Sequence, residues 1–257
     1  MSGPPSVVLL HGQPGSAADW DPVLPHLEGL RVLAPTRPGY DGTSAGGFGV
    51  NAAAVLRLLD AEGLDQVVVV AHSWAGGIAL RLALEAPERV GALALLGSVG
   101  SLRALTLADR VLAAPVLRGG SARAADRLGA RFARLAETAS GSRLAPTARS
   151  ALKQQLSDLS RDAWTAFAIE QRAFVHEAPA LARQLGSVAV PAVVAVGRRD
   201  VIVSPRAQWD LADRLPHSEV LEHDGGHLVQ LEDSALVARA VHRAVALAST
   251  GRRSRAP

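Results

Sequence analysis

One stretch, residues 67–82 with the sequence VVVVAHSWAGGIALRL, constrains the fold more than any other part of the chain. It begins with four valines, and an unbroken β-branched run is typical of a strand buried on both faces of a parallel sheet. After Gly77, apolar residues recur among alanines, as they do in a largely buried helix. The stretch therefore predicts a buried strand that passes through a tight turn into a buried helix.

The turn holds Ser73 in the pattern small-x-Ser-x-small, which is the signature of a nucleophile elbow. Such a turn is strained and lifts the serine hydroxyl clear of the sheet. The residues two before and two after the serine must be small because the two backbones nearly touch. Glycine is usual at both positions, whereas this chain has Ala71 and Ala75. The alternative is an ordinary strand-to-helix turn that contains a serine, and the rest of the chain favours the elbow.

Composition limits the class of protein. The 257 residues are 48% hydrophobic, which suffices for one large α/β domain, and the absence of cysteine excludes disulfides and thiolate chemistry. The chain has no basic-then-apolar leader and no apolar run of about 18 residues, so we expect a cytoplasmic protein without a membrane partner. The net charge is only +3, and no aromatic residues are interleaved with the arginines, so we expect no nucleic-acid partner.

Strand-like runs alternate with helical patterns in the first hundred residues and again after Pro191. This alternation predicts an α/β fold with a mostly parallel sheet of about six strands and right-handed crossovers. The expected strands are residues 6–10, 31–34, 67–70, 90–96, 192–196 and 218–222. The expected helices outside the middle segment include residues 21–30, 50–62, 204–215 and 234–248.

Residues 101–186 have a different character, because alanine, leucine and arginine recur there at helical spacing and no strand-like run occurs. We expect a helical cap, broken at Pro115, at residues 119–120, at Gly141 and at Pro146. The predicted core is residues 1–100 and 187–250. The arginine-rich residues 251–257 are expected to be a disordered tail.

Three polar residues follow predicted strands: Ser73, then Asp200, then His227. The carboxyl ends of parallel strands open on one edge of a sheet, so these side chains can meet although they are far apart in sequence. The order Ser, Asp, His is that of the α/β-hydrolase triad.

The segments HGQPGS, RPGYDGTS, AHSWAGG, GRRDVIVSP and GGHL occur in the order and at the spacing of one family. With them the chain resembles the α/β-hydrolase superfamily, close to its small serine esterases and cofactor-free peroxidase-like hydrolases. The resemblance covers residues 7–100 and 191–247 and implies a serine hydrolase with no cofactor. Many relatives begin with an antiparallel hairpin. Only about five residues precede the first expected strand here, so we expect that hairpin to be absent and this strand to lie nearer an edge of the sheet.

The triad chemistry needs these residue types. A serine hydroxyl is a weak nucleophile near neutral pH, so the imidazole of His227 must accept its proton. A carboxylate on the other ring nitrogen fixes the tautomer and stabilises the imidazolium, and Asp200 is our candidate. Asp224 is a rival, but it is too close to His227 in sequence to reach around the ring easily.

An oxyanion forms during acyl transfer and needs two preorganised donors. The backbone N–H of Trp74 lies at a predicted helix N-terminus, where free N–H groups favour an anion. The resemblance implies that the backbone N–H of Gln13 is the second donor. The Trp74 ring either borders the acyl pocket or packs in the core.

Trp164, Phe167 and Phe174 share one face of a predicted cap helix. They either pack onto the core or, for Trp164 and Phe167 above all, form the roof of a substrate pocket over Ser73. His11 and His72 are expected to form hydrogen bonds within their loops. No spacing of histidines predicts a metal site, because the Gly225-Gly226 pair between His223 and His227 argues against a helical ligand pair.

We therefore expect an enzyme that cleaves a carboxylic ester or related small, apolar acyl substrate through an acyl-enzyme on Ser73. The same triad can instead serve carbon–carbon bond hydrolysis, perhydrolysis, lactone opening or a biosynthetic cyclisation. An alternative of another class is a ligand-binding signalling protein with a slow or silent triad. Ser73 in place of an aspartate disfavours dehalogenase and epoxide-hydrolase chemistry. The oligomeric state stays open.

Overall fold

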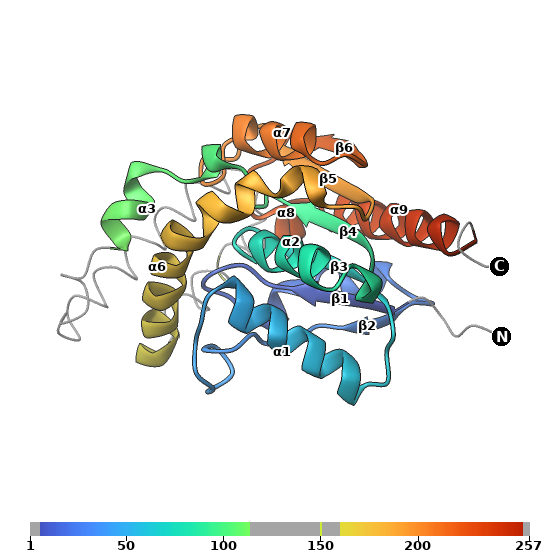
Figure 1. Ribbon diagram of the computed structural model, residues 1–257, viewed down its shortest axis with the longest axis horizontal. Coiled ribbons are helices and arrows are strands. Elements are labelled where there is room, and N and C mark those ends of the chain that lie inside the picture. The colour runs from blue at the N-terminus through green and yellow to red at the C-terminus, as the bar shows by residue number, and fades with distance from the viewer. Residues whose placement is uncertain (1–5, 114–149, 151–159, 254–257) are drawn as a thin grey trace.

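The computed structural model describes residues 6–113, 150 and 160–253, and the structural statements below concern these residues. They contain one six-stranded sheet with the strand order β2-β1-β3-β4-β5-β6, in which every neighbouring pair is parallel (Figure 1). The strands are β1 (Ser6–Leu10), β2 (Arg31–Leu33), β3 (Val67–His72), β4 (Val90–Leu96), β5 (Ala192–Gly197) and β6 (Ser218–His223). β1 lies one position from the edge strand β2, as expected.

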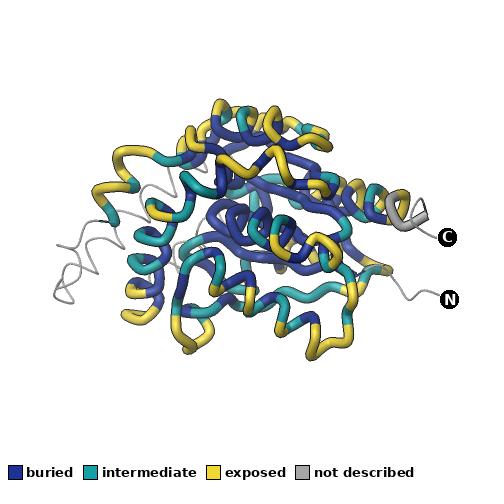
Figure 2. The backbone as a smooth tube through the Cα atoms, viewed as in Figure 1, coloured by how far each residue is buried: buried dark blue, intermediate teal, exposed yellow. Residues whose placement is uncertain are grey.

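The central strand β3 explains why the sheet has two apolar faces. Its side chains alternate, so that Val67 and Val69 belong to one buried cluster and Val68 and Val70 to the other. The first cluster includes residues of α1 (Phe48–Ala61), α2 (Ala75–Glu85) and α7 (Pro205–Arg214). The second includes residues of α8 (Val229–Glu232) and α9 (Ser234–Arg253). In Figure 2 the inner strands and α2 are mostly dark blue, whereas α1, α7 and α9 carry yellow, exposed residues on their outer sides.

Two expected helices differ from the observed ones. The segment 21–30 is not an α-helix, so that prediction was wrong: the chain forms two 3₁₀ helices, Ala17–Trp20 and Leu24–His26. Pro22 and Pro25 lack the N–H donors that a longer helix needs, which accounts for the short turns. At the other end, α9 continues to Arg253 and takes in the first three residues of the expected tail. Residues 254–257 lie outside the described residues.

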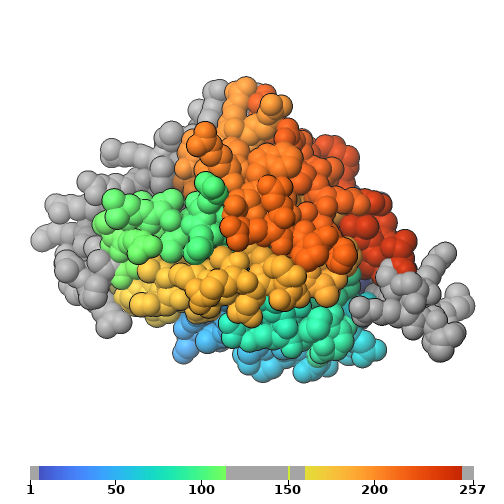
Figure 3. All heavy atoms as spheres, turned by 45° about the horizontal axis from the view of Figure 1, so that its top comes forward, coloured from blue at the N-terminus to red at the C-terminus, as the bar shows by residue number. Residues whose placement is uncertain are grey.

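The described part of the cap is helical. It consists of the 3₁₀ turn Leu102–Ala104, α3 (Leu107–Leu112), α6 (Arg161–Arg183) and the 3₁₀ turn Leu185–Ser187. The hydroxyl of Ser160 caps α6 by accepting a hydrogen bond from the N–H of Ala163 at 3.1 Å. Figure 3 shows α6 crossing the molecular surface between α7 and α2. The expected breaks at Pro115, Gly119, Gly120, Gly141 and Pro146 lie outside the described residues.

Within the described ranges, no helix is both long and apolar enough to cross a membrane.

Candidate active site

Ser73 lies in a sharp turn between β3 and α2. Its φ of 56° makes it the one non-glycine residue with positive φ in the described part of the chain. The backbone around it is held firmly, because its N–H donates to the Leu96 carbonyl and its own carbonyl accepts from Gly76 and Val99, each at 3.0 Å. A left-handed serine is strained, and this strained strand-to-helix turn is the geometry of a nucleophile elbow.

The small residues in and after the elbow are small for different steric reasons. Ala71 and Ala75 are fully buried, so the fold accommodates a methyl group at both positions where glycine is usual. The closest approach falls later, at the first turns of α2. A Cβ on Gly76 would lie 2.5 Å from the Ser98 Cβ, and one on Gly77 would lie 2.2 Å from the Phe48 ring. The two glycines therefore leave room where α2 passes the loop after β4 and the Phe48 ring of α1.

The three predicted triad residues come together at the carboxyl edge of the sheet. The Nε2 of His227 lies 2.9 Å from the Ser73 Oγ, and its Nδ1 lies 2.8 Å from the Asp200 Oδ2. All three side chains are buried, with residue exposures of 7%, 7% and 3% for Ser73, His227 and Asp200. This continuous hydrogen-bonded chain is the arrangement that proton transfer from serine to histidine requires.

The carboxylate of Asp200 accepts hydrogen bonds on both oxygens. Its Oδ1 accepts from the N–H groups of Ile202 and Val203 at 2.8 and 2.9 Å. Its Oδ2 accepts from His227 and also from the Gln208 side chain at 2.9 Å. Asp224, the rival carboxylate, instead forms an exposed pair with Arg199 at 3.0 Å.

His72 contacts His227 across the site. The two ring centroids are 4.9 Å apart, and the His72 Nε2 donates to the backbone carbonyl of His227 at 2.8 Å. Burial lowers the pKa of His72 to about 3, so its ring is neutral at physiological pH. The expectation that His72 forms a hydrogen bond within its own loop was wrong, because its partner lies 155 residues away.

The two N–H groups predicted to receive the oxyanion lie in the two loops next to Ser73. The Trp74 N–H is at the N-terminus of α2, and Gln13 follows β1 in the loop that begins at His11. Among the described residues, neither N–H has a hydrogen-bond partner. The Gln13 side chain donates to the Gln171 side chain on α6 at 2.8 Å.

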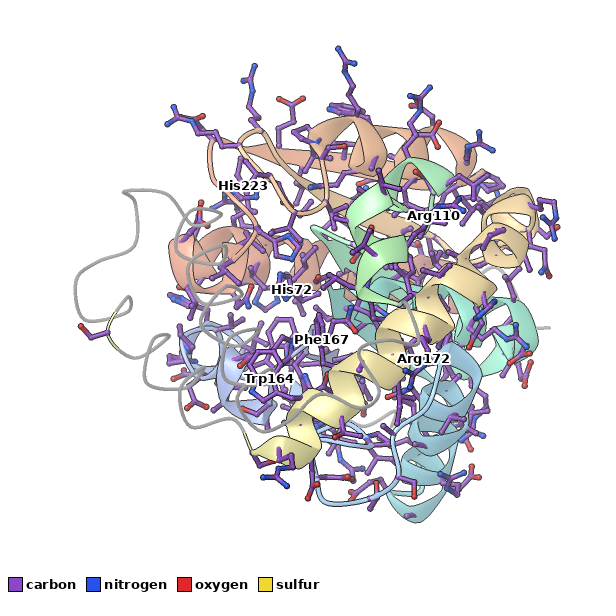
Figure 4. All side chains as sticks on the ribbon, turned by 90° about the vertical axis from the view of Figure 1, so that its left-hand side faces the viewer. His72, Arg110, Trp164, Phe167, Arg172 and His223 are labelled. Carbon is purple, nitrogen blue, oxygen red and sulfur yellow. The ribbon has the colours of Figure 1, made fainter. Side chains whose placement is uncertain are left out.

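The aromatic candidates separate into two groups. The Trp74 ring is 1% exposed and packs 4.7 Å from the Phe48 ring, while Phe174 lies 6.3 Å from Phe48, so both pack in the core. Trp164 and Phe167 form an edge-to-face pair with centroids 5.9 Å apart. In Figure 4 both rings project from α6 toward the region that holds His72. Their role as a pocket roof stays a prediction.

A buried polar cluster lies beside the site, and sequence reasoning did not assign it a role. Arg37, 2% exposed, pairs with Glu170 of α6, which is fully buried and also accepts from the Tyr40 hydroxyl at 2.8 Å. Burial raises the pKa of Glu170 above its usual value, and the charge of Arg37 opposes this rise. The RPGY motif was the one signal of it in the sequence. No group of three His, Cys, Asp or Glu residues in the described ranges could hold a metal ion.

A parallel sheet with helices on both faces and Ser, Asp and His at its carboxyl edge defines an α/β hydrolase. The comparison with known families agrees: the alpha/beta hydrolase fold family matches residues 5–234. The chain belongs to this family.

Curated relatives match over shorter lengths. Lipase LipV of Mycobacterium tuberculosis is 33% identical over 120 residues, which are 44% of this chain and 46% of that protein. A 2-hydroxy-6-oxo-6-phenylhexa-2,4-dienoate hydrolase of Burkholderia cepacia is 35% identical over 105 residues, 37% of each chain. The matches thus span less than half the length of these relatives. The solved structure of the enzyme of the same name from Rhodococcus sp. strain RHA1 has a TM-score of 0.75 and 25% identity, and covers 93% of this chain and 90% of that one.

Proposed function

We propose that the protein is a serine hydrolase that cleaves a carboxylic ester or a related apolar acyl compound. The observation that carries the proposal is the continuous contact from the Ser73 Oγ through His227 to Asp200, at 2.9 and 2.8 Å. Ser73 is the nucleophile, His227 the general base and acid, and Asp200 the carboxylate that holds the Nδ1–H tautomer. The similarity to a lipase supports an acyl substrate.

The proposed reaction has two halves. His227 takes the proton of Ser73 as the Oγ attacks the acyl carbon, and then returns it to the leaving alcohol as the acyl-enzyme forms. Water, deprotonated by the same imidazole, attacks the acyl carbon, the bond to the Ser73 Oγ breaks, and His227 returns the proton to Ser73 as the acid is released. In both halves the N–H groups of Gln13 and Trp74 stabilise the oxyanion, and each donor contributes about 3–4 kcal/mol to the lowering of the barrier.

The test is covalent labelling with a fluorophosphonate, together with turnover of p-nitrophenyl acyl esters. We expect one adduct, on Ser73, and loss of both labelling and turnover in Ser73→Ala. Ser249→Ala is the matched control, since its exposed hydroxyl only bonds the Val245 carbonyl on α9. An adduct on another residue, or turnover that survives Ser73→Ala, would refute the proposal. Tight ligand binding without turnover would favour the silent-triad alternative.

A second candidate reaction is hydrolysis of a carbon–carbon bond, for which the same triad serves. The observation that favours it is that two relatives are named for a hydroxy-oxo-dienoate, a compound without an ester bond. Incubation with 2-hydroxy-6-oxo-6-phenylhexa-2,4-dienoate decides between the two. Release of benzoate at a kcat/KM above that for the esters would make this the principal activity, and no release would exclude it for this substrate.

A further inference from the structure

The buried cluster around Arg37 holds the loop that carries Gln13. The guanidinium uses all three of its nitrogens: Nε donates to the His11 carbonyl at 2.8 Å, and Nη2 donates to the Gly12 carbonyl at 2.6 Å. Nη1 donates to the Asn51 side chain at 3.1 Å and to Glu170. Because Arg37 is 2% exposed and fully engaged, it is not available to bind a substrate carboxylate.

His11 supplies a second donor to the same carbonyl. Its Nε2 accepts a hydrogen bond from the Arg37 N–H at 2.9 Å, so Nε2 carries no proton. Burial, aided by the charge of Arg37, holds the pKa of His11 well below its usual value, so the ring is neutral and its proton is on Nδ1. That Nδ1–H donates to the Gly12 carbonyl at 2.9 Å.

The Gly12 carbonyl and the Gln13 N–H belong to one peptide group. This peptide is trans, so its C=O and N–H bonds lie in one plane and point in opposite directions. Two donors on the carbonyl, one of them charged, therefore fix the direction of the N–H. They also draw electron density toward the oxygen and strengthen the N–H as a donor, because hydrogen bonds in a chain polarise one another in a low dielectric.

We propose that Arg37 is a positioning residue that acts through the Gly12 carbonyl to orient and polarise the Gln13 N–H toward the oxyanion formed at Ser73. This inference rests on the proposed function. Glu170 offsets the buried charge of Arg37, because an unpaired guanidinium would be costly at this depth. The cap helix α6 thereby joins the oxyanion loop at two places, through Glu170 and through the contact of Gln171 with Gln13.

The central variant is Arg37→Met, which keeps the volume and removes the donors. We expect kcat for a p-nitrophenyl ester to fall about 10- to 100-fold while KM changes by less than about threefold, because the lost interaction operates in the transition state. Arg37→Lys, which restores a charge but cannot reach every acceptor, should recover part of the loss. The control is Leu59→Ala, a buried α1 residue remote from the loop, which lowers stability by removing packing.

A spectroscopic measurement tests the inference apart from turnover. In Arg37→Met the amide proton resonance of Gln13 should move upfield, because its peptide is less polarised, and in Leu59→Ala it should stay in place. If wild-type protein is neither labelled nor active, the proposed function fails, and the Gln13 resonance still decides the positioning role. If kcat and the resonance change equally in both variants, Arg37 is only structural and the inference is wrong.

Glu170→Gln removes the ion pair with Arg37 but leaves the contacts of Arg37 with the two carbonyls. It also provides a test if Arg37→Met does not fold. We expect lower stability but a kcat within about fivefold of wild type, because Arg37 keeps both carbonyl partners and such a loss is far below that of a missing oxyanion donor. A fall in kcat of tenfold or more relative to wild type would contradict the proposed route through Gly12.

Discussion

Replacing Asp200 by Asn tests the assignment of the triad acid most sharply. Each oxygen of Asp200 accepts two hydrogen bonds, one pair from Ile202 and Val203 and the other from His227 and Gln208. An amide nitrogen must therefore face two donors whichever way the side chain is turned. If the oxygen stays on the two backbone N–H groups, the NH₂ faces His227 and Gln208.

The consequences for rate and stability follow from this geometry. His227 can accept from the NH₂ by moving its proton to Nε2, but that proton then points at Ser73 and the ring can no longer act as base. We expect kcat to fall about 10³- to 10⁴-fold, as for a wrong tautomer in other triads, which is about 4–5.5 kcal/mol. The Gln208 N–H then faces the NH₂ group and has lost its acceptor, so the free energy of unfolding should fall by about 1–3 kcal/mol.

The assay compares kcat for a p-nitrophenyl ester and urea unfolding in Asp200→Asn and Asp224→Asn. Asp224 is the matched control, because its pair with Arg199 is exposed and worth about 0–1 kcal/mol. We expect this control to retain wild-type kcat. A larger loss of kcat in Asp224→Asn, or a less than tenfold loss in Asp200→Asn, would refute the reasoning.

Three further predictions concern other parts of the site. Because burial lowers the pKa of His72 from 6.5 to about 3, the unfolded chain binds its proton more tightly and the fold loses stability as pH falls from 6.5 toward 3. Between pH 7 and pH 4 the unfolding free energy, measured with urea, should therefore fall by up to about 3 kcal/mol less in His72→Gln than in the exposed control His217→Gln. An equal fall in the two variants would contradict this. Ser73→Gly should be about 1 kcal/mol more stable than Ser73→Ala in thermal unfolding, because glycine relieves the φ of 56°. Trp164→Ala or Phe167→Ala should change the ranking of acyl esters by kcat/KM while fluorophosphonate still labels Ser73, and a change in stability alone would show that these rings only pack.

Several parts of the fold could be predicted from sequence because their signals are local. The strands β1, β3, β4 and β5 are buried apolar runs bounded by turn residues, while β2 and β6 are shorter or more polar and are indicated mainly by their place in the alternation. The ends differ by only a few residues, as in β3, which continues to His72 instead of ending at Val70. The segment 21–30 failed because its apolar spacing suits a helix, while Pro22 and Pro25 limit it to 3₁₀ turns.

Sequence could predict only those site residues that the order of the strand ends and the chemistry of their side chains identify. Ser73, Asp200 and His227 follow from strand ends, because the topology of a parallel sheet brings those ends together. Gln208 and Glu170 could not be found in this way. Gln208 reads as an ordinary helix residue, and Glu170 meets Arg37 across 133 residues, from a segment whose placement no local pattern specifies.

The helix α6 shows why one sequence pattern can hold different roles. Its buried face follows a spacing of three and four residues, which predicts a packed face and nothing more. In the structure that face meets three environments in turn. The first turns carry Trp164 and Phe167, and the later turns carry Phe174 into the core. Between them, Glu170 contacts Arg37 and Gln171 contacts Gln13. Substitutions of equal size along this face should therefore differ in effect. Those at the first turns should change substrate ranking, Glu170→Gln should lower stability with at most a small change in kcat, and those from Phe174 onward should change stability alone.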